Sequence, residues 1–265
     1  MAAPTLLALD FDGVLCDGLI EYFQTAWKAY CQLFARAEKT PPPGLAERFY
    51  PLRPVIETGW EMPLLLHALL QGVDEAAVLD HWPTLVQEIL TETGIQPGPA
   101  MAIVDGVRDT WIQTDLEGWL SLHRFYPGVL ERVQQAISTG VYPVIISTKE
   151  GRFIQALLAR AGVELAPAQI IGKEIKQPKT KTLRQLLQSP PVIGSEPPIV
   201  WFLEDRFKTL EKVKAEADLA DVSLFLGDWG YNTQAEKEQA QRDSRIHLLS
   251  LSQLVREFSA WTVVK

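Results

Sequence analysis

Residues 5–13 read TLLALDFDG, an apolar run that ends abruptly in two aspartates and a glycine. An apolar run without polar alternation is typical of a strand buried on both faces, as in a parallel sheet. Similar runs recur at residues 142–146, 199–203, 222–226 and 246–249. We therefore expect five buried strands, of which residues 5–9 form the first.

Apolar residues at helical spacing separate these runs. The stripes are Val129, Leu130, Val133 and Ile137; Phe153, Ile154, Leu157, Leu158 and Ala161; and Phe207, Leu210, Val213 and Ala217. Each stripe places its members on one face of a helix. Strands that alternate with amphipathic helices predict an α/β fold, with a doubly wound, Rossmann-like parallel sheet as its core.

Residues 17–121 interrupt this alternation. They contain no convincing buried strand and instead predict helices over residues 19–34, 62–71, 75–93 and about 106–120, with a turn at 40–44 and a loop at 96–99. Five of the eight tryptophans lie here, and we expect them to form the core of this segment. We predict an α-helical cap over 17–121, inserted into an α/β core made of 1–16 and 122–265, with a loop at 189–198.

The charge of the chain is concentrated in the predicted cap. The 265 residues have a formal net charge of −8, and 47% are hydrophobic and 22% charged, as in ordinary globular proteins. Residues 17–121 carry 15 acidic and 6 basic side chains, a net charge of −9, whereas the rest of the chain is nearly neutral. A general nucleic-acid binder needs a basic face, so we expect no nucleic-acid partner.

Cysteine content and hydropathy exclude several other classes. Cys16 and Cys31 are the two cysteines, and they do not have the spacing of a zinc site or a disulfide framework. The apolar runs are far shorter than the roughly 20 residues of a membrane-spanning helix. The N-terminus has no basic segment followed by a long apolar one, so secretion is not indicated. We expect a cytoplasmic protein without a membrane partner.

Polar side chains follow three of the predicted strands. Asp10 and Asp12 follow the first, Ser147-Thr148-Lys149 the second, and Glu204 and Asp205 the third. Ligands of doubly wound sheets bind beyond the carboxyl ends of the strands. Acids also cap helices, but that role does not explain their placement at successive strand ends. Several carboxylates in one place repel each other without a cation, and Mg²⁺ prefers oxygen ligands of this kind.

These motifs resemble those of the haloacid dehalogenase-like (HAD) hydrolase superfamily. Its first motif, a strand followed by DxDG[TV]L, is similar to residues 6–15, and its second, a strand ending in Ser or Thr, to residues 144–147. Its fourth, a strand ending in two acids, is similar to residues 200–205. Residues 126–129 and 226–231 also resemble segments of this family. The resemblance covers the predicted core.

The third motif of the family is a lysine, and several lysines lie near the expected position. Pro178-Lys179-Thr180 at the start of an apolar helical pattern resembles the motif best, with Lys176 as the alternative. The chain departs from many relatives after Asp205, where Arg206 and Thr209 replace a serine and an aspartate.

The resemblance implies a Mg²⁺ site and a nucleophile. Asp10 would attack phosphorus and form an aspartyl-phosphate. Mg²⁺ would be held by the Asp10 carboxylate, the Asp12 backbone carbonyl and Asp205, with Glu204 in support.

The resemblance also implies which residues transfer the proton and which bind the phosphoryl group. Asp12 would protonate the leaving oxygen and then deprotonate the attacking water. Ser147 and Lys179 would hold the phosphoryl oxygens. The expected activity is Mg²⁺-dependent hydrolysis of a small phosphate monoester, with a small phosphorylated metabolite as the partner.

Two alternatives remain open from the sequence. A sugar phosphomutase of the same superfamily would share every core residue named above. A catalytically idle relative, acting as a binding or regulatory module, is suggested by Arg206 and Thr209. The oligomeric state, the cap residues that set specificity and the substrate (phosphoglycolate, a sugar phosphate or a nucleotide monophosphate) are not determined by the sequence.

Overall fold

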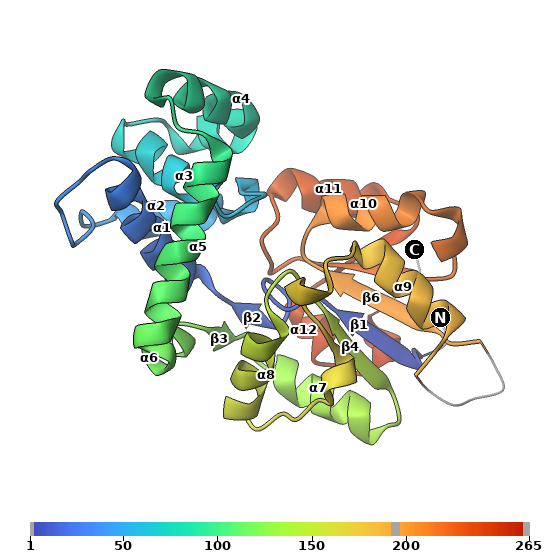
Figure 1. Cartoon of the computed structure of the whole chain (residues 1–265). Coiled ribbons are helices and arrows are strands. Elements are labelled where there is room, and N and C mark those ends of the chain that lie inside the picture. Colours follow the sequence, from blue (N-terminus) through green and yellow to red (C-terminus); the bar gives the residue numbers. More distant parts are fainter. Residues whose placement is uncertain (1–2, 192–196, 262–265) are drawn as a thin grey trace. The chain divides into compact units, whose positions relative to one another are not determined.

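The computed structural model describes residues 3–191 and 197–261 (Figure 1). Contacts divide the chain into two compact units. One, the α/β unit, combines Met1–Asp17 with Arg124–Lys265, and the other, the helical unit, is Gly18–His123. Part of the loop predicted at 189–198 lies outside the described residues.

The α/β unit is built on a six-stranded parallel sheet with the order β5-β4-β1-β6-β7-β8. Its strands are β1 (Leu6–Leu9), β4 (Tyr142–Ile146), β5 (Ile170–Ile171), β6 (Val200–Glu204), β7 (Ser223–Gly227) and β8 (Ile246–Leu249). In the central strand β1, Leu9 pairs with Ile145 of β4 and with Leu203 of β6. The predicted α/β class with a parallel, Rossmann-like sheet is confirmed.

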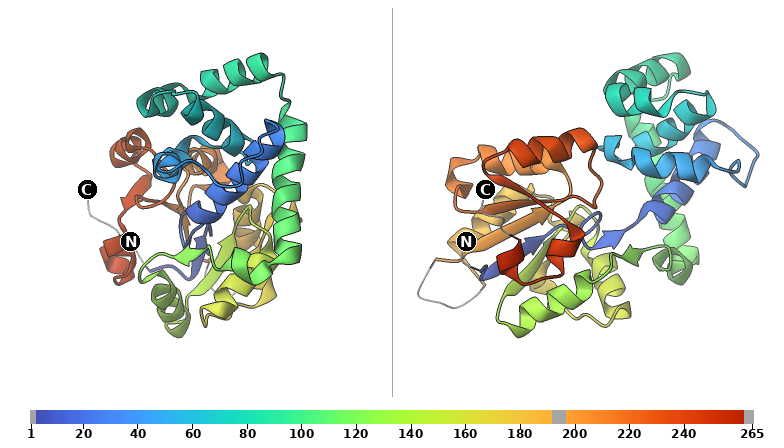
Figure 2. Two further views of the ribbon diagram at one scale, coloured as in Figure 1. Left: turned by 90° about the vertical axis from the view of Figure 1, so that its left-hand side faces the viewer. Right: turned by 180° about the vertical axis from the view of Figure 1, so that it is seen from behind.

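One face of the sheet packs against three helices. They are α9 (Lys179–Gln188), α10 (Phe207–Ala215) and α11 (Gln234–Arg242), which lie on the same side of the sheet in Figures 1 and 2. Alternate residues of each strand point to this face. Leu6 and Ala8 of β1 thus share a buried cluster with Leu183 of α9 and Leu210 of α10.

An aromatic cluster covers the opposite face of the sheet, where the other alternate residues of each strand point. Trp201 of β6 and Phe225 of β7 contact Trp261 at 5.7 and 5.6 Å between ring centroids. Phe258 lies on Trp201, and the guanidinium of Arg132 lies over the Phe258 ring at 3.9 Å. Arg132 belongs to α7 (Val129–Ser138) and Phe258 to η5 (Phe258–Ala260), and Trp261 directly follows η5. The helix α12 (Leu251–Leu254) lies on the same side of the sheet (Figure 2). Both faces of the sheet are therefore covered.

The remaining elements of this unit are short, apart from α8 (Gly151–Arg160). They are β2 (Cys16–Asp17), which pairs antiparallel with β3 (Arg124–Phe125), and η2 (Pro167–Gln169), η3 (Lys173–Ile175) and η4 (Ala217–Leu219). The strand β5 was not expected, because two residues give no periodic signal. The stripe expected through Ile137 is wrong at its end, since Ile137 is 41% exposed.

The helical unit is all-α over its described length. Its elements are α1 (Leu19–Leu33), α2 (Leu45–Phe49), η1 (Tyr50–Val55), α3 (Glu61–Leu70), α4 (Glu75–Thr93), α5 (Pro97–Thr114) and α6 (Leu116–Leu120). The loop expected at 96–99 is wrong, because α5 already begins at Pro97. Proline suits the first turn of a helix, where its missing N–H has no partner to lose.

A buried carboxylate joins three helices of this unit. Glu21 of α1 accepts hydrogen bonds from Thr25 (2.7 Å), from the guanidinium of Arg108 in α5 (2.7 and 3.1 Å) and from the indole of Trp119 in α6 (3.1 Å). A buried charge is tolerated when it is paired and hydrogen-bonded in this way. Trp27 and Trp82 are also buried, which agrees with a tryptophan-rich core. Among the described residues, no helix is long and apolar enough to cross a membrane.

Candidate active site

The carboxyl ends of β4, β1 and β6 lie side by side in the sheet. Asp10 directly follows β1, and its backbone N–H donates to the Leu203 carbonyl at 2.9 Å. Glu204 is the last residue of β6, Asp205 follows it, and Ser147 follows β4. Three predicted acids and the predicted serine thus reach one edge of the sheet.

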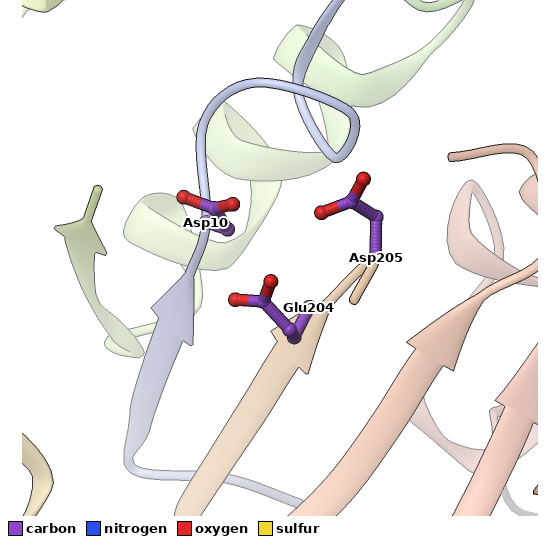
Figure 3. A group of neighbouring side chains, drawn as sticks. All are labelled: Asp10, Glu204 and Asp205. Carbon is purple, nitrogen blue, oxygen red and sulfur yellow. The ribbon is translucent and has the colours of Figure 1, made fainter. Parts of the chain in front are cut away.

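Asp10, Glu204 and Asp205 form a buried cluster of carboxylates. One oxygen from each lies within 4.8 Å of the others, and Figure 3 shows the three groups pointing into the same space beyond β1 and β6. Two carboxylates at this distance repel each other by about 3–4 kcal/mol at an effective dielectric constant near 20. The cluster therefore requires positive charge.

Lys179 supplies one positive charge to this cluster. It is the first residue of α9, and its Nζ lies 2.6 Å from Glu204 Oε2 and 2.9 Å from Asp10 Oδ1. Burial opposes the charge of this ammonium, but Asp10 and Glu204 outweigh that effect and raise the pKa of Lys179 above its usual range. Lys176, the alternative third-motif lysine, is exposed. The structure thus brings Lys179, and not Lys176, to the carboxylates.

Burial shifts the titration of the two acids that end β6. Desolvation raises the pKa of Glu204 well above its usual value, against the opposing effect of Lys179. Desolvation and the nearby Asp10 carboxylate raise the pKa of Asp205 to about 6, although the Tyr231 amide opposes this. Lys179 therefore offsets only part of the negative charge of the cluster.

A loop after β7 holds Asp205. The backbone N–H of Tyr231 donates to Asp205 Oδ2 at 2.8 Å, and the Asn232 side chain donates to the Asp205 carbonyl at 3.0 Å. A second bond from Asn232 to the Gly227 carbonyl, at 2.7 Å, closes the loop. The hydroxyl of Tyr231 donates to Asp17 Oδ1 at 3.0 Å. One carboxylate oxygen of Asp205 is thereby fixed by the backbone.

The other oxygen of Asp205 is available for a ligand. Oδ1 is buried and, within residues 3–191 and 197–261, has no hydrogen-bond partner. Gly13 and Gly230 enclose the carboxylate so closely that a Cβ on either residue would overlap Asp205. Gly13 also has φ +87°, which favours glycine. A buried, unpaired carboxylate oxygen is what a bound cation would satisfy.

Asp12 lies in the turn after β1 and contacts a second lysine. The Phe11 carbonyl accepts the amides of residues 14–16, which fixes the turn. Both oxygens of Asp12 lie close to Lys149 Nζ, at 3.2 and 3.3 Å. Asp12 is not part of the cluster of three carboxylates. Lys149 follows Ser147 by two residues and was not among the site residues predicted from the sequence.

Ser147 is held by a hydrogen bond to β5 and by one from the residue two positions after it. Its N–H donates to the Ile171 carbonyl of β5 at 3.0 Å, and its Oγ accepts the Lys149 amide at 3.2 Å. The serine is buried apart from 8% of its surface. Its hydroxyl proton remains available for an acceptor, because Oγ acts as the acceptor in this contact.

Arg206 and Thr209 stand where the motif departs from many relatives. The Arg206 amide donates to Glu204 Oε1 at 3.2 Å, and its guanidinium opposes the rise in the pKa of Asp205. Neither side chain offers a carboxylate. The buried carboxylate cluster therefore consists of Asp10, Glu204 and Asp205.

The donor set fits a hard divalent cation. Three carboxylates and one ammonium leave a formal charge of about −2 when all four groups are ionised. Carboxylate oxygens are the ligands preferred by Mg²⁺. The unpartnered Oδ1 of Asp205 lies within this set. The residues present are therefore able to hold a metal ion.

No model of a protein family matches the sequence. The curated proteins contain no match to it either. Solved structures do match its fold. A candidate phosphatase from Clostridium difficile has a TM-score of 0.57 and 12% identity, over 96% of this chain and 98% of that chain. A candidate haloacid dehalogenase-like hydrolase from Bacteroides fragilis has a TM-score of 0.55 and 19% identity, over 95% and 100%.

A third structure comes from Haemophilus somnus 129PT and is described as a candidate phosphoglycolate phosphatase. Its TM-score is 0.54 and its identity 13%, over 88% of this chain and 89% of that chain. At such identities the likeness establishes the fold. Together with the motifs at the strand ends, it shows that this chain has the fold of the haloacid dehalogenase-like hydrolases.

Proposed function

We propose that this chain is a Mg²⁺-dependent phosphatase that hydrolyses a small phosphate monoester through an aspartyl-phosphate at Asp10. The observation that carries the proposal is the buried cluster of Asp10, Glu204 and Asp205, paired with Lys179. Such a cluster has no role in packing, because buried like charges destabilise a core. It becomes favourable when a cation and a phosphate are bound.

Each residue has a defined part in the proposed reaction. A carboxylate oxygen of Asp10 attacks phosphorus, the P–O bond to the leaving group breaks, and Asp12 gives its proton to the leaving oxygen. Water then attacks the aspartyl-phosphate and loses a proton to Asp12, which releases phosphate and restores Asp10. Ser147 and Lys179 hold the phosphoryl oxygens throughout.

Asp10, Asp205 and the Asp12 carbonyl would hold Mg²⁺, with Glu204 in support. When bound, the ion offsets the repulsion between the Asp10 carboxylate and the substrate phosphate. Lys179 complements this effect, because its ammonium already lies 2.9 Å from Asp10. Residues 17–121 would serve as the cap of the enzyme, a type of element that excludes water from a reaction.

The candidate substrates follow from the solved structures and from the charge of the chain. The Haemophilus somnus structure is described as a candidate phosphoglycolate phosphatase, so phosphoglycolate belongs in a substrate panel beside sugar phosphates and nucleotide monophosphates. The net charge of −9 on residues 17–121 favours small partners over polyanions. A cytoplasmic location stays a prediction from the sequence.

The proposal is tested by turnover of an aryl phosphate with Mg²⁺, with EDTA, and in the Asp10→Asn variant. Activity should require both the ion and Asp10, and quenched reactions should contain a phosphorylated peptide that includes Asp10. Asp221→Asn, a change at an exposed aspartate before β7, is the matched control and should keep full activity. Turnover that survives both EDTA and Asp10→Asn would refute the proposal.

A further inference from the structure

A lysine outside the predicted set contacts the residue proposed to move the proton. Lys149 Nζ lies 3.2 and 3.3 Å from the two oxygens of Asp12. The Lys149 side chain is 8% exposed and that of Asp12 is 16% exposed. A lysine this buried is uncommon unless it is paired, so the contact is a specific one.

The backbone of Lys149 is fixed on both sides. Its N–H donates to Ser147 Oγ at 3.2 Å, and its carbonyl accepts the Lys173 amide at 2.9 Å. These two bonds fix the backbone of Lys149 just after the carboxyl end of β4, the strand next to β1. The ammonium reaches the Asp12 carboxylate from this strand and not from the turn that carries Asp12.

The turn after β1 positions the Asp12 backbone but not its carboxylate. The Phe11 carbonyl and the bond from the Gly13 amide to the Cys16 carbonyl at 2.8 Å define the main chain. The Asp12 side chain retains two torsions. In the described part of the chain, the carboxylate of Asp12 accepts two hydrogen bonds, both from Lys149, so Lys149 determines where the carboxylate points.

The two lysines at this edge form ion pairs with different acids. Lys179 contacts Asp10 and Glu204, whereas Lys149 contacts Asp12. We propose that Lys149 is a positioning residue, which orients the Asp12 carboxylate toward the oxygen that receives its proton. This inference rests on the proposed phosphatase function. Holding a reacting group in place removes part of the entropic barrier of its step.

The inference predicts an effect that depends on the leaving group. Dinitrophenolate leaves without a proton, whereas the alkoxide of glycerol phosphate needs one. General acid catalysis contributes about 10²–10⁴-fold. We therefore expect Lys149→Met to lower kcat/KM by about 10- to 100-fold for glycerol phosphate and by less than about threefold for dinitrophenyl phosphate.

Controls separate positioning from a loss of charge or of structure. Lys173→Met removes an exposed lysine from the same region and should leave both esters unaffected. Lys149→Arg keeps a cation that can pair with a carboxylate and should restore part of the glycerol phosphate activity. Asp12→Asn combined with Lys149→Met should be no slower on glycerol phosphate than Asp12→Asn alone, within about twofold, because the lysine acts through Asp12.

An equal loss on both esters would overturn the inference, since it would mean that Lys149 binds the phosphoryl group itself. An additive loss in the double variant would overturn it as well. In both cases dinitrophenyl phosphate turnover by the unmodified chain, dependent on Mg²⁺ and Asp10, would leave the proposed function intact. If that turnover is missing, the proposed function fails and the inference fails with it.

Discussion

Replacing Asp205 by asparagine tests the charge balance of the site without any substrate. The pKa of Asp205 is raised from 3.8 to about 6 by burial and by the nearby Asp10. The unfolded chain therefore binds the proton more weakly than the folded one, and the charged carboxylate destabilises the fold above about pH 6. Asparagine keeps an oxygen for the Tyr231 amide but carries no charge.

The expected gain follows from the size of the shift. About two pKa units correspond to about 3 kcal/mol, so Asp205→Asn should raise the free energy of unfolding by about 2–3 kcal/mol near pH 8 in EDTA. This corresponds to about 5–10 °C in the Tm of the α/β unit. The gain should shrink as the pH falls from about 6 and vanish below about pH 3, where the carboxylate of the unmodified chain is protonated in both states.

Differential scanning calorimetry in EDTA across this pH range measures the effect. Mg²⁺ at about a thousand times its Kd should reverse the order of the two proteins, because it stabilises the unmodified chain by about 4.1 kcal/mol, whereas the variant has lost a ligand of the ion. Asp221→Asn controls for the removal of any aspartate. A loss of stability in Asp205→Asn that is the same at every pH would refute the argument.

Three further outcomes are expected. Arg108→Met removes the guanidinium that pairs with the buried Glu21 carboxylate and should lower the free energy of unfolding in urea by about 3–5 kcal/mol. Adding Glu21→Gln to this variant should recover part of the lost stability, and no recovery would contradict the pairing. Gly13→Ala should weaken Mg²⁺ binding in calorimetric titrations at least about tenfold, because the added Cβ would overlap the Asp205 carboxylate. Gly140→Ala is the control and should bind Mg²⁺ normally, since Gly140 has a similar φ of +85° but open space where the Cβ would lie. Lys179→Met should lower the Tm in EDTA, because Asp10 and Glu204 lose the ammonium that pairs with them at a cost of about 3–5 kcal/mol. Adding Mg²⁺ should raise the Tm of this variant by more than it raises the Tm of the unmodified chain. An unchanged Tm in EDTA would contradict the ion pairs.

The sheet and its active edge could be predicted because burial leaves a strong signal. Residues 6–9 are covered on both faces, so every position is apolar, and the change to Asp10 marks the end of the strand. The same holds for β6, where Glu204 ends the run. Polar residues immediately after buried strands are conspicuous in a sequence, and parallel pairing brings them to one edge.

The choice of the third-motif lysine, the contact between Lys149 and Asp12 and the start of α5 depend on three-dimensional information that a sequence pattern does not carry. The choice between Lys176 and Lys179 depends on where α9 begins and which way its first side chain points. Likewise, Lys149 and Asp12 are 137 positions apart, and their contact follows from the pairing of β4 with β1. The two prolines and the glycine of residues 97–99 predict a loop because proline disrupts the interior of a helix, but Pro97 occupies the first turn of α5, where proline is favoured.

The central position of β1 has a consequence for the order in which the molecule is completed. Leu6 pairs with Tyr142 and with Val200, so β1 waits for two partners that emerge more than a hundred residues after it. Gly18–His123, in contrast, is one continuous segment that has all of its own partners before β4 is made. Domains fold as units during synthesis, and distant pairings form slowly. Asp10 is therefore translated well before β4 and β6, and its surroundings form only after both of these strands have emerged.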